Sequence, residues 1–337
     1  MIDLLVAGGG PAGLATAIHA ALAGLRAVVV EPRAAPVDKA CGEGLMPGGV
    51  AALRAMGVTL QGHPLAGIDY IGPTARVRAD FAHTRGLGVR RTALHAALAE
   101  RAADLGVPVI AAKLDDLRQD EHGVEAAGLR ARWLVAADGL HSPIRARLRL
   151  GLPDRRPSRY GLRRHFHVAP WSDHVEVHWS AAGEAYVTPV SDDLVGVAIL
   201  STRRMSYDDH LAAFPTLLPK LTGEPATAVR GAGPLRQRVR ARVAGRVLLV
   251  GDAAGYTDAL TGEGLCLAVR CAQALVGCLV EDRAGDYEHA WRRLSRTHRL
   301  LTGALLEAAR RQSTARLVVP AAARLPWLFT AVVRALA

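Results

Sequence analysis

Near its start the chain has two apolar runs separated by a helix-like stretch. Residues 2–7 and 26–30 have the largely apolar pattern of buried parallel strands, and residues 14–24 between them are rich in alanine. Asp3 is the one charged residue inside the first run, and Glu31 ends the second. The pattern therefore predicts a strand–helix–strand unit at the beginning of an α/β fold.

Further along, the period of the pattern changes twice. Residues 93–105 read as a helix, and residues 107–112, 130–136 and 245–250 read as buried strands. Residues 61–84 and 156–235 instead contain short alternating runs, which are typical of an antiparallel sheet with its own core. Two long helices are expected over residues 264–281 and 287–311, followed by an apolar tail.

These patterns predict three parts. A discontinuous α/β domain is expected over residues 1–60, 86–155 and 236–285, and an inserted antiparallel sheet domain over residues 61–85 and 156–235. Residues 286–337 are expected to form a C-terminal helical segment. The predicted fold class is α/β, with a Rossmann-like domain of the glutathione-reductase type, an inserted antiparallel sheet and C-terminal helices.

The turn between the first strand and the helix carries a glycine pattern. Gly8, Gly10 and Gly13 have the spacing G-x-G-x-x-G, and Glu31 follows the second strand. In this context the first glycine permits the tight turn, the second lets backbone approach a pyrophosphate, and the third lets helix and strand pack closely. A carboxylate at position 31 can accept hydrogen bonds from an adenosine ribose. The pattern predicts a dinucleotide site.

Composition narrows the classes of partner. The chain has 337 residues, half of them apolar, and a formal net charge of +11 carried mostly by arginines spread along the sequence. Aromatic residues make up only 4%, so a stacking platform for single-stranded nucleic acid is excluded and no nucleic-acid partner is expected. The four cysteines show no C-x-x-C pair and no metal-ligand spacing, so we expect reduced thiols, no metal site and a cytoplasmic protein. The first strand begins at the N-terminus, so no signal peptide is expected, and no uncharged apolar run is long enough to span a bilayer.

Two later motifs join the first. Ala137-Asp138-Gly139 is followed by Ser142 and Arg145, and Gly251-Asp252-Ala253-Ala254 is followed by Thr261-Gly262-Glu263-Gly264. In this order the three pieces resemble the FAD-dependent oxidoreductases of the p-hydroxybenzoate hydroxylase and geranylgeranyl reductase superfamily. The resemblance extends from residue 1 to about residue 285.

The resemblance implies that FAD is the cofactor and that Glu31 binds its adenosine ribose. It also implies that Asp252 meets the ribityl-pyrophosphate region, while the start of the following helix approaches the pyrimidine edge of the flavin. A helix N-terminus there would stabilise the negative charge of reduced flavin. The cofactor-binding residues expected on this basis are Gly8, Gly10, Pro11, Ala12, Gly13, Glu31, Pro32, Arg33, Cys41, Gly42, Arg91, Asp138, Gly139, Gly251, Asp252, Gly262, Glu263 and Gly264.

The loop over residues 39–47 resembles the geranylgeranyl reductase branch, in which Cys-Gly follows a lysine. Residues 183–189 are similar to an aromatic stretch of that branch, but only Tyr186 of its aromatics is present and Thr188 replaces a phenylalanine. The segment also resembles flavin-dependent halogenases, although their paired tryptophans are missing. Cys41 and Tyr186 are the expected catalytic residues.

Several reactions remain open. The first hypothesis is an NAD(P)H-driven monooxygenase that acts through a flavin C4a-hydroperoxide on an apolar aromatic or polyketide-like molecule. The second is a reductase that saturates isoprenoid C=C bonds, and the third is a non-catalytic FAD protein that holds a reactive intermediate. No second nucleotide-binding glycine motif occurs, because Gly86-x-Gly88 lacks a third glycine, so NAD(P)H is expected as a transient donor, or a separate flavin or ferredoxin reductase as a partner.

Two further features have alternative interpretations. His165, His167, His174 and His178 alternate on predicted strands, where polar positions flanking a pocket are favoured over metal ligands. The tail from Arg316 is apolar enough to cover the substrate sheet or to lie on a membrane surface, so peripheral membrane contact is a second possibility for the protein's location. An apolar small-molecule substrate is expected, because Arg163 and Arg164 are the only anion clamp in the substrate region.

Overall fold

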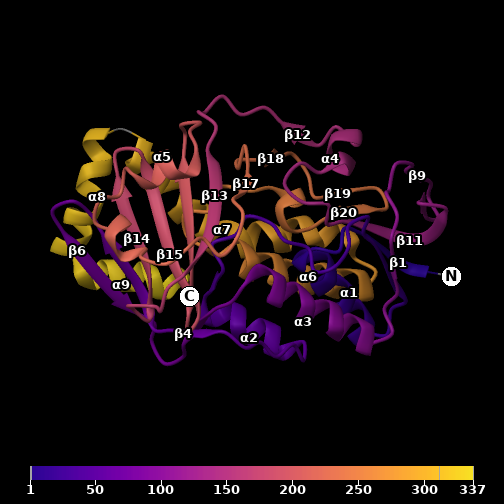
Figure 1. Cartoon of the computed structure of the whole chain (residues 1–337). Helices are drawn as coiled ribbons and strands as arrows, with labels where there is room; N and C mark the ends of the chain where they lie inside the picture. The colour runs from indigo at the N-terminus through magenta and orange to yellow at the C-terminus, as the bar shows by residue number, and fades with distance from the viewer. Residues whose placement is uncertain (1, 311, 337) are drawn as a thin grey trace.

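A computed structural model describes residues 2–310 and 312–336. The molecule has two halves side by side, with the N-terminus at the far end of one half and the last helices covering the other (Figure 1). The first half is built on a sheet whose central strands β20-β11-β1-β2-β8 are all parallel neighbours. Its strands are β1 (Ile2–Ala7), β2 (Ala27–Val30), β8 (Val109–Ile110), β9 (Arg118–Gln119), β10 (Val124–Ala126), β11 (Leu129–Ala136), β19 (Val243–Ala244) and β20 (Val247–Leu249).

Helices pack on this sheet and on one another. The helix between β1 and β2 is α1 (Pro11–Leu22), which contacts both α3 (Arg91–Asp104) and α6 (Gly264–Val280). It begins three residues earlier than predicted, since Pro11 occupies its first turn, where the missing N–H and fixed φ of proline are favourable. The strand–helix–strand unit predicted from the apolar pattern is confirmed. The shorter helices of this half are α2 (Pro47–Ala55) and α4 (Pro143–Arg147).

The second half is built on a seven-stranded sheet in the order β17-β13-β16-β15-β14-β5-β6. Its neighbours are antiparallel except for β14 and β5, which run parallel because β5 enters from a distant part of the chain. A small sheet β3-β7-β4 connects the two halves, and a further pair is β12 with β18. The strands are β3 (Gly44–Leu45), β4 (His63–Leu65), β5 (Gly67–Ile71), β6 (Arg76–Asp80), β7 (Gly86–Gly88), β12 (Gly151–Leu152), β13 (Tyr160–His167), β14 (His174–Ser180), β15 (Gly183–Ser191), β16 (Leu194–Ser201), β17 (Arg230–Ala232) and β18 (Arg238–Val239).

Three C-terminal helices follow, and the last two of them cover one face of the second sheet. They are α7 (Tyr287–Arg310), α8 (Gln312–Arg324) and α9 (Pro326–Leu336); α8 contacts β6 and β14, and α9 contacts β6. Val319, Phe329 and Val333 join Tyr70 and Val77 in one apolar cluster. Short elements complete the chain: α5 (Tyr207–Leu211) and the 3-10 turns Leu218–Lys220, Gly251–Ala254 and Ala284–Asp286.

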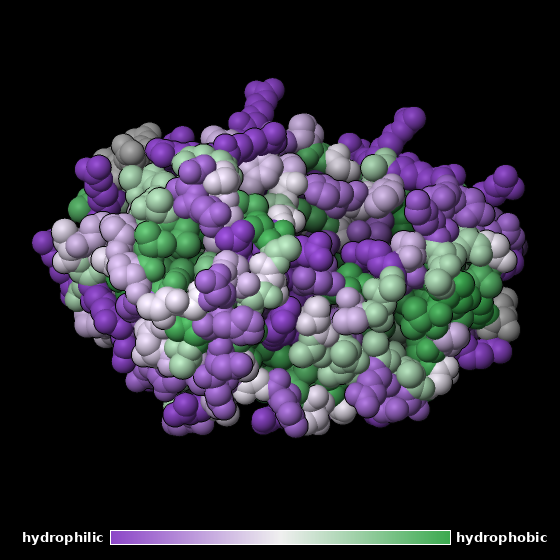
Figure 2. All heavy atoms as spheres, in the orientation of Figure 1, coloured by the Kyte–Doolittle hydropathy of each residue, from purple (hydrophilic) through white to green (hydrophobic). Residues whose placement is uncertain are grey.

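Within residues 2–310 and 312–336, no single helix is long and apolar enough to cross a bilayer. The segments Thr314–Arg324 and Pro326–Leu336 meet the length and composition of a span together, but they are bent by 100° at their junction. On the face seen in Figure 2, strongly hydrophilic residues are spread over both halves, with separate apolar patches between them. The boundaries of the three predicted parts remain a prediction.

Candidate cofactor and substrate site

A cavity of about 680 Å³ lies between the two sheets. It extends from the glycine turn before α1 to the inner faces of α7, α8 and α9, so one continuous space serves both halves. Most of the residues predicted from the sequence line it. They are Gly10, Pro11, Ala12, Arg33, Cys41, Gly42, Arg91, Asp138, Gly139, Tyr186, Gly251, Asp252, Gly262 and Gly264.

The glycines of the first turn have two different roles, because some are required by packing and one leaves space for a ligand. A Cβ on Gly13 would lie 1.8 Å from the Gly8 carbonyl oxygen, and Gly8 itself has φ +108°, so both glycines are required by packing and backbone conformation. At Gly10, by contrast, a Cβ would come no closer to any described heavy atom than 3.9 Å, to Nη2 of Arg91. Gly10 therefore leaves room in the cavity rather than relieving a clash in the protein.

Glu31 lies beneath this turn and is 4% exposed. One of its oxygens accepts a hydrogen bond from the Gly9 N–H at 2.8 Å, and the Arg33 guanidinium binds both oxygens at 2.7 and 2.8 Å. Burial acts to raise the pKa of Glu31, but the hydrogen bonds from Arg33 and Gly9 outweigh it and lower the pKa. An adenosine ribose would compete with the half-exposed Arg33 for these oxygens. Neither Glu31 nor Pro32 lines the cavity.

Arg91 and Asp138 are two of the polar side chains on the wall that have a buried atom without a hydrogen-bond partner. Arg91 is 6% exposed, and its Nη1 has no hydrogen-bond partner among the described residues; the same holds for Oδ1 of Asp138. The other oxygen of Asp138 accepts the Ile144 N–H at 3.1 Å, and burial raises the pKa of this carboxyl group. Buried polar atoms are normally satisfied, so these two indicate a polar ligand.

The third motif forms the opposite wall. Gly251 and Gly262 have φ of +61° and +69°, which permits the tight path of the loop, and α6 begins at Gly264 on the cavity surface. The first N–H groups of a helix have no partner within the helix and attract negative charge. Burial raises the pKa of Asp252, while the positive charges of Lys39, Arg91 and Arg145 oppose this shift. Glu263 turns away from the cavity, because its carboxylate lies 3.1 Å from Nδ1 of His298.

These features fit FAD. The space at Gly10 admits a pyrophosphate at the start of α1, and the buried, unsatisfied Arg91 supplies positive charge beside it. The start of α6 faces the region where a flavin would carry negative charge. The individual cofactor contacts predicted from the sequence remain predictions.

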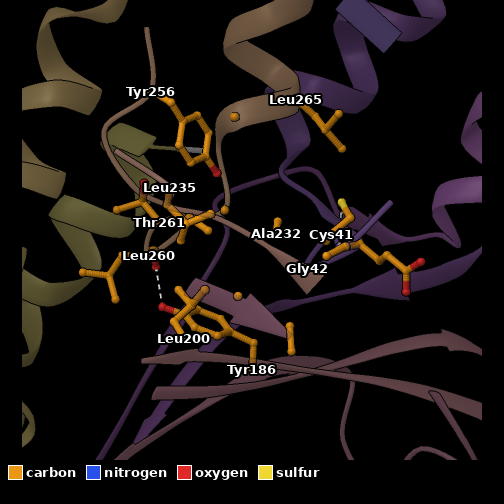
Figure 3. A pocket seen from close by; sticks show the side chains of 18 of the residues that line it. Cys41, Gly42, Tyr186, Leu200, Ala232, Leu235, Tyr256, Leu260, Thr261 and Leu265 are labelled. Carbon is orange, nitrogen blue, oxygen red and sulfur yellow. Dashed lines mark hydrogen bonds between the residues drawn. The ribbon is translucent and has the colours of Figure 1, made fainter. Parts of the chain in front are cut away.

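Beyond the cofactor region the cavity becomes apolar (Figure 3). Cys41 and Tyr186 both line it, from the loop before β3 and from β15. The Tyr186 hydroxyl donates a 2.9 Å hydrogen bond to the Leu260 carbonyl, which ties the substrate sheet to the loop before α6. Burial raises the pKa of the Cys41 thiol and raises that of Tyr186 well above its ordinary value. Both side chains therefore hold their protons at neutral pH.

Tyr256, which the sequence did not indicate as a site residue, lines the cavity on the cofactor side (Figure 3). Its ring lies 3.4 Å from the position that a Cβ on Gly264 would occupy, so it covers the start of α6. Burial also raises its pKa well above the ordinary value. Nothing in the pattern around residue 256 distinguishes it from a core tyrosine, since its role depends on how the loop folds.

A buried polar network behind the Cys41 loop was also missed. Glu43 Oε2 lies 2.5 Å from His165 Nε2, and His165 Nδ1 lies 3.1 Å from Nη1 of Arg163. Arg163, 1% exposed, in turn binds Asp38. Both Nη atoms of Arg163 are therefore engaged by the protein itself, while its Nε, on the cavity wall, has no hydrogen-bond partner among the described residues.

The other predicted strand histidines lie apart. His174 Nε2 is 2.7 Å from Asp80, and His178 Nε2 is 3.0 Å from Glu176, while His167 is exposed. Among the described residues, no group of three or more His, Cys, Asp or Glu side chains is arranged to hold a metal ion. The buried histidines of these strands are thus each paired with a carboxylate.

Comparison with known proteins identifies the family to which this chain belongs. A family model described as "FAD binding domain" matches residues 1–290. The chain is 29% identical over 338 residues to the menaquinone reductase of Mycolicibacterium smegmatis, covering 88% of this chain and 80% of that protein. It is 29% identical to digeranylgeranylglycerophospholipid reductase 1 of Methanothermobacter thermautotrophicus, covering 86% and 82%. The rifampicin monooxygenase of Streptomyces venezuelae is 33% identical over 172 residues, which is 47% of this chain and 36% of that protein.

Solved structures show the same fold. The flavin-dependent brominase Bmp2 superposes with a TM-score of 0.83 at 18% identity, covering 99% of this chain and 93% of that chain. The halogenase PltM, solved in complex with phloroglucinol and FAD, superposes with a TM-score of 0.78 at 15% identity, covering 91% and 76%. At these identities the likeness concerns the fold alone.

The fold and the site together define an FAD-dependent oxidoreductase. The chain belongs to the FAD binding domain family. These findings confirm the predicted α/β fold with a second sheet and C-terminal helices. They also confirm the FAD cofactor and the superfamily that the three motifs predict.

Proposed function

We propose that the protein is an FAD-dependent reductase that saturates a C=C bond of an isoprenoid-like chain. The observation that carries this proposal is the apolar end of the cavity. Its walls there include Leu301 and Leu305 of α7, Val318 of α8, and Phe329 and Val333 of α9. A space with this apolar lining suits a hydrocarbon chain better than a compact polar molecule.

Two of the relatives that match over most of both chains favour the same class, while another of similar coverage is named aurachin C monooxygenase/isomerase. The menaquinone reductase and the digeranylgeranylglycerophospholipid reductase each align over at least 80% of their own length. Their names denote reductases, whereas the rifampicin monooxygenase aligns over about a third of its length. This shifts the preference from hydroxylation, which the sequence patterns placed first, to reduction.

Saturating a C=C bond takes two electrons and two protons. Reduced FAD, when bound, supplies the electron pair and one proton. Cys41 holds a proton on Sγ at neutral pH because burial raises its pKa, and we assign it the second proton, which solvent then restores. The Tyr186 hydroxyl proton is engaged by the Leu260 carbonyl, so Tyr186 orients the wall beside the reacting bond.

Other groups of the chain position the reaction. The unsatisfied Arg91 guanidinium and the start of α6 at Gly264 place positive charge on the cofactor side of the cavity. The apolar lining excludes water from the substrate side, which protects the reacting carbons from competing proton transfer. We propose NAD(P)H, or a separate reductase protein, as the source of electrons.

A monooxygenase is the second candidate. It is favoured by the 33% identity to the rifampicin monooxygenase, which is higher than the identity to either reductase although the matched segment is shorter. Hydroxylation of an aromatic or polyketide-like substrate would use the same dry cavity. It differs from reduction in requiring dioxygen.

Product mass tests the proposal. The FAD-loaded protein is supplied with a reductant and a detergent-solubilised polyprenyl compound, with and without dioxygen. We expect a product heavier by two hydrogens in both atmospheres, and about a tenfold or greater loss of rate in Cys41→Ser. Cys278→Ser, a thiol outside the cavity, is the control and should keep the parent rate. An oxygen-containing product formed only in air, or no product with any substrate, contradicts the proposal.

A further inference from the structure

We infer that the corner between α8 and α9 docks on an anionic lipid bilayer and admits the hydrocarbon chain of the substrate into the cavity. The docking surface consists of residues 324–328, whose sequence is Arg-Leu-Pro-Trp-Leu. All five are exposed, and Trp327 is 68% exposed. The part of the inference that concerns the substrate rests on the proposed function, whereas the part that concerns the bilayer does not.

Exposed apolar side chains gather on these helices. Leu325 and Leu328 are 45% and 44% exposed beside Trp327, and Leu300 of α7 and Leu317 of α8 are each about 60% exposed. Exposed single leucines are ordinary on protein surfaces, but an exposed tryptophan within two residues of two exposed leucines at a helix junction is not. Tryptophan with neighbouring leucines is the composition that enters the boundary between lipid headgroups and acyl chains.

The positive charge of the C-terminal helices favours a membrane surface that carries anionic lipids. After Glu307, which forms an ion pair with Arg310, the sequence contains five arginines, at positions 310, 311, 316, 324 and 334, and no aspartate or glutamate. Arginines beside an apolar surface are attracted to anionic lipids, by about 1 kcal/mol or roughly fivefold for each charge near the surface. The same excess of one sign opposes a symmetric contact with a second copy of this chain, which would bring like charges together.

The corner is also part of the cavity wall. Leu325 and Leu328 line the cavity although both are more than 40% exposed, so they form its boundary with the outside. The next residue of α9, Phe329, is 8% exposed and packs at 4.8 Å, between ring centroids, on Tyr70 inside. A chain crossing between Leu325 and Leu328 would pass directly from the bilayer boundary into the apolar half of the cavity.

The geometry favours a surface contact over a span. The segments Thr314–Arg324 and Pro326–Leu336 are bent by 100° at this corner, and both pack on the sheet of the second half. A corner held in this way presents its tip to a membrane while the helices stay on the protein. The other strongly exposed large apolar residues, such as Leu22, Val109 and Leu218, lie on separate elements.

Vesicle co-sedimentation of the full-length, FAD-loaded chain tests the inference. We expect the parent to sediment with vesicles that contain phosphatidylglycerol and not with phosphatidylcholine alone. The double variant Trp327→Ala/Leu328→Ser, and separately Arg324→Glu, should each lower the vesicle partition coefficient by about fivefold or more. Leu218→Ser, which removes a leucine of similar exposure from another element, should bind as the parent does.

Three results overturn the inference: no sedimentation of the parent, equal binding to both kinds of vesicle, or variants that bind like the parent. Light scattering that finds a dimer dependent on Trp327 would assign the corner to a second copy instead. A short-chain alkene in detergent separates this inference from the proposed function. If that alkene is reduced but vesicles are not bound, only docking fails; if vesicles are bound but no alkene is reduced, only the reductase assignment fails.

Discussion

Glu43 and His165 form a buried contact, with Oε2 of the carboxylate 2.5 Å from Nε2 of the ring. His165 is fully buried and Glu43 is 2% exposed. The second carboxylate oxygen accepts the backbone N–H of Arg91 at 2.8 Å. Glu43 thus connects three parts of the site: the Cys41 loop, the start of α3, and the strand β13 of the substrate sheet.

Removal of either partner should destabilise the protein strongly. In Glu43→Ala the buried His165 loses its carboxylate, and in His165→Ala the buried carboxylate loses its partner, so each change is expected to lower the free energy of unfolding by about 3–5 kcal/mol. Chemical denaturation of both single variants and of the double variant measures the coupling, expected at about 0.5–3 kcal/mol. Strictly additive effects would show that the contact is not a stabilising unit.

The glycines of the first turn should separate cofactor binding from folding. Gly10→Val places atoms in the open space of the cavity, so FAD affinity should fall by about tenfold or more while the thermal midpoint of the FAD-free protein changes little. Gly13→Ala forces a contact with the Gly8 carbonyl and should lower that midpoint as well. Flavin fluorescence titration and thermal melts measure both quantities. Unchanged FAD affinity in Gly10→Val would contradict the placement of the cofactor.

Cys41 should react slowly with alkylating agents for two reasons. Burial raises the pKa of its thiol, so alkylation by iodoacetamide, which requires the thiolate, is expected to be about tenfold or more slower at neutral pH than for a free cysteine peptide and to accelerate at alkaline pH. Adding FAD should slow it further, because Cys41 lines the cavity, while Cys278 outside it reacts as before. Peptide mapping by mass spectrometry reports each site. Equal reaction of Cys41 with and without FAD would contradict the site.

Glu176 should make stability depend on pH in the acid range. Burial acts to raise its pKa, but hydrogen bonds from His178 and Trp171 and the charge of Lys220 outweigh this and lower the pKa from 4.5 to about 2. Because the folded state favours the charged form, this stabilisation is present above pH 4.5 and is lost as pH falls towards about 2. The loss is on the order of 3 kcal/mol. Denaturation across this range should give a shallower pH dependence for Glu176→Gln, and an unchanged slope would contradict the assignment.

The first half of the fold could be predicted because its signals are local. The run of residues 2–7, the glycine turn and Glu31 lie within one strand–helix–strand unit, where sequence neighbours are also neighbours in space. The same holds for Asp138 and Asp252, each of which follows a buried strand. Motif spacing identifies such residues without knowledge of the tertiary fold.

The substrate half could be predicted only in outline. The contact between Glu43 and His165 spans 122 positions, and no periodicity indicates which carboxylate meets which histidine. The parallel pairing of β5 with β14 depends on long-range packing in the same way. The role of Tyr256 likewise appears only once the loop before α6 is placed against Gly264.

Anaerobic reoxidation of the flavin shows whether the protein transfers electrons from FAD to a C=C bond. The FAD-loaded protein is reduced without dioxygen and mixed with a detergent-solubilised polyprenyl compound, while flavin absorbance and the number of C=C bonds are followed. We expect the flavin to be reoxidised with about one C=C bond lost for each flavin, and Cys41→Ser to slow this step while Cys278→Ser does not. Flavin that stays reduced until dioxygen is admitted would contradict it.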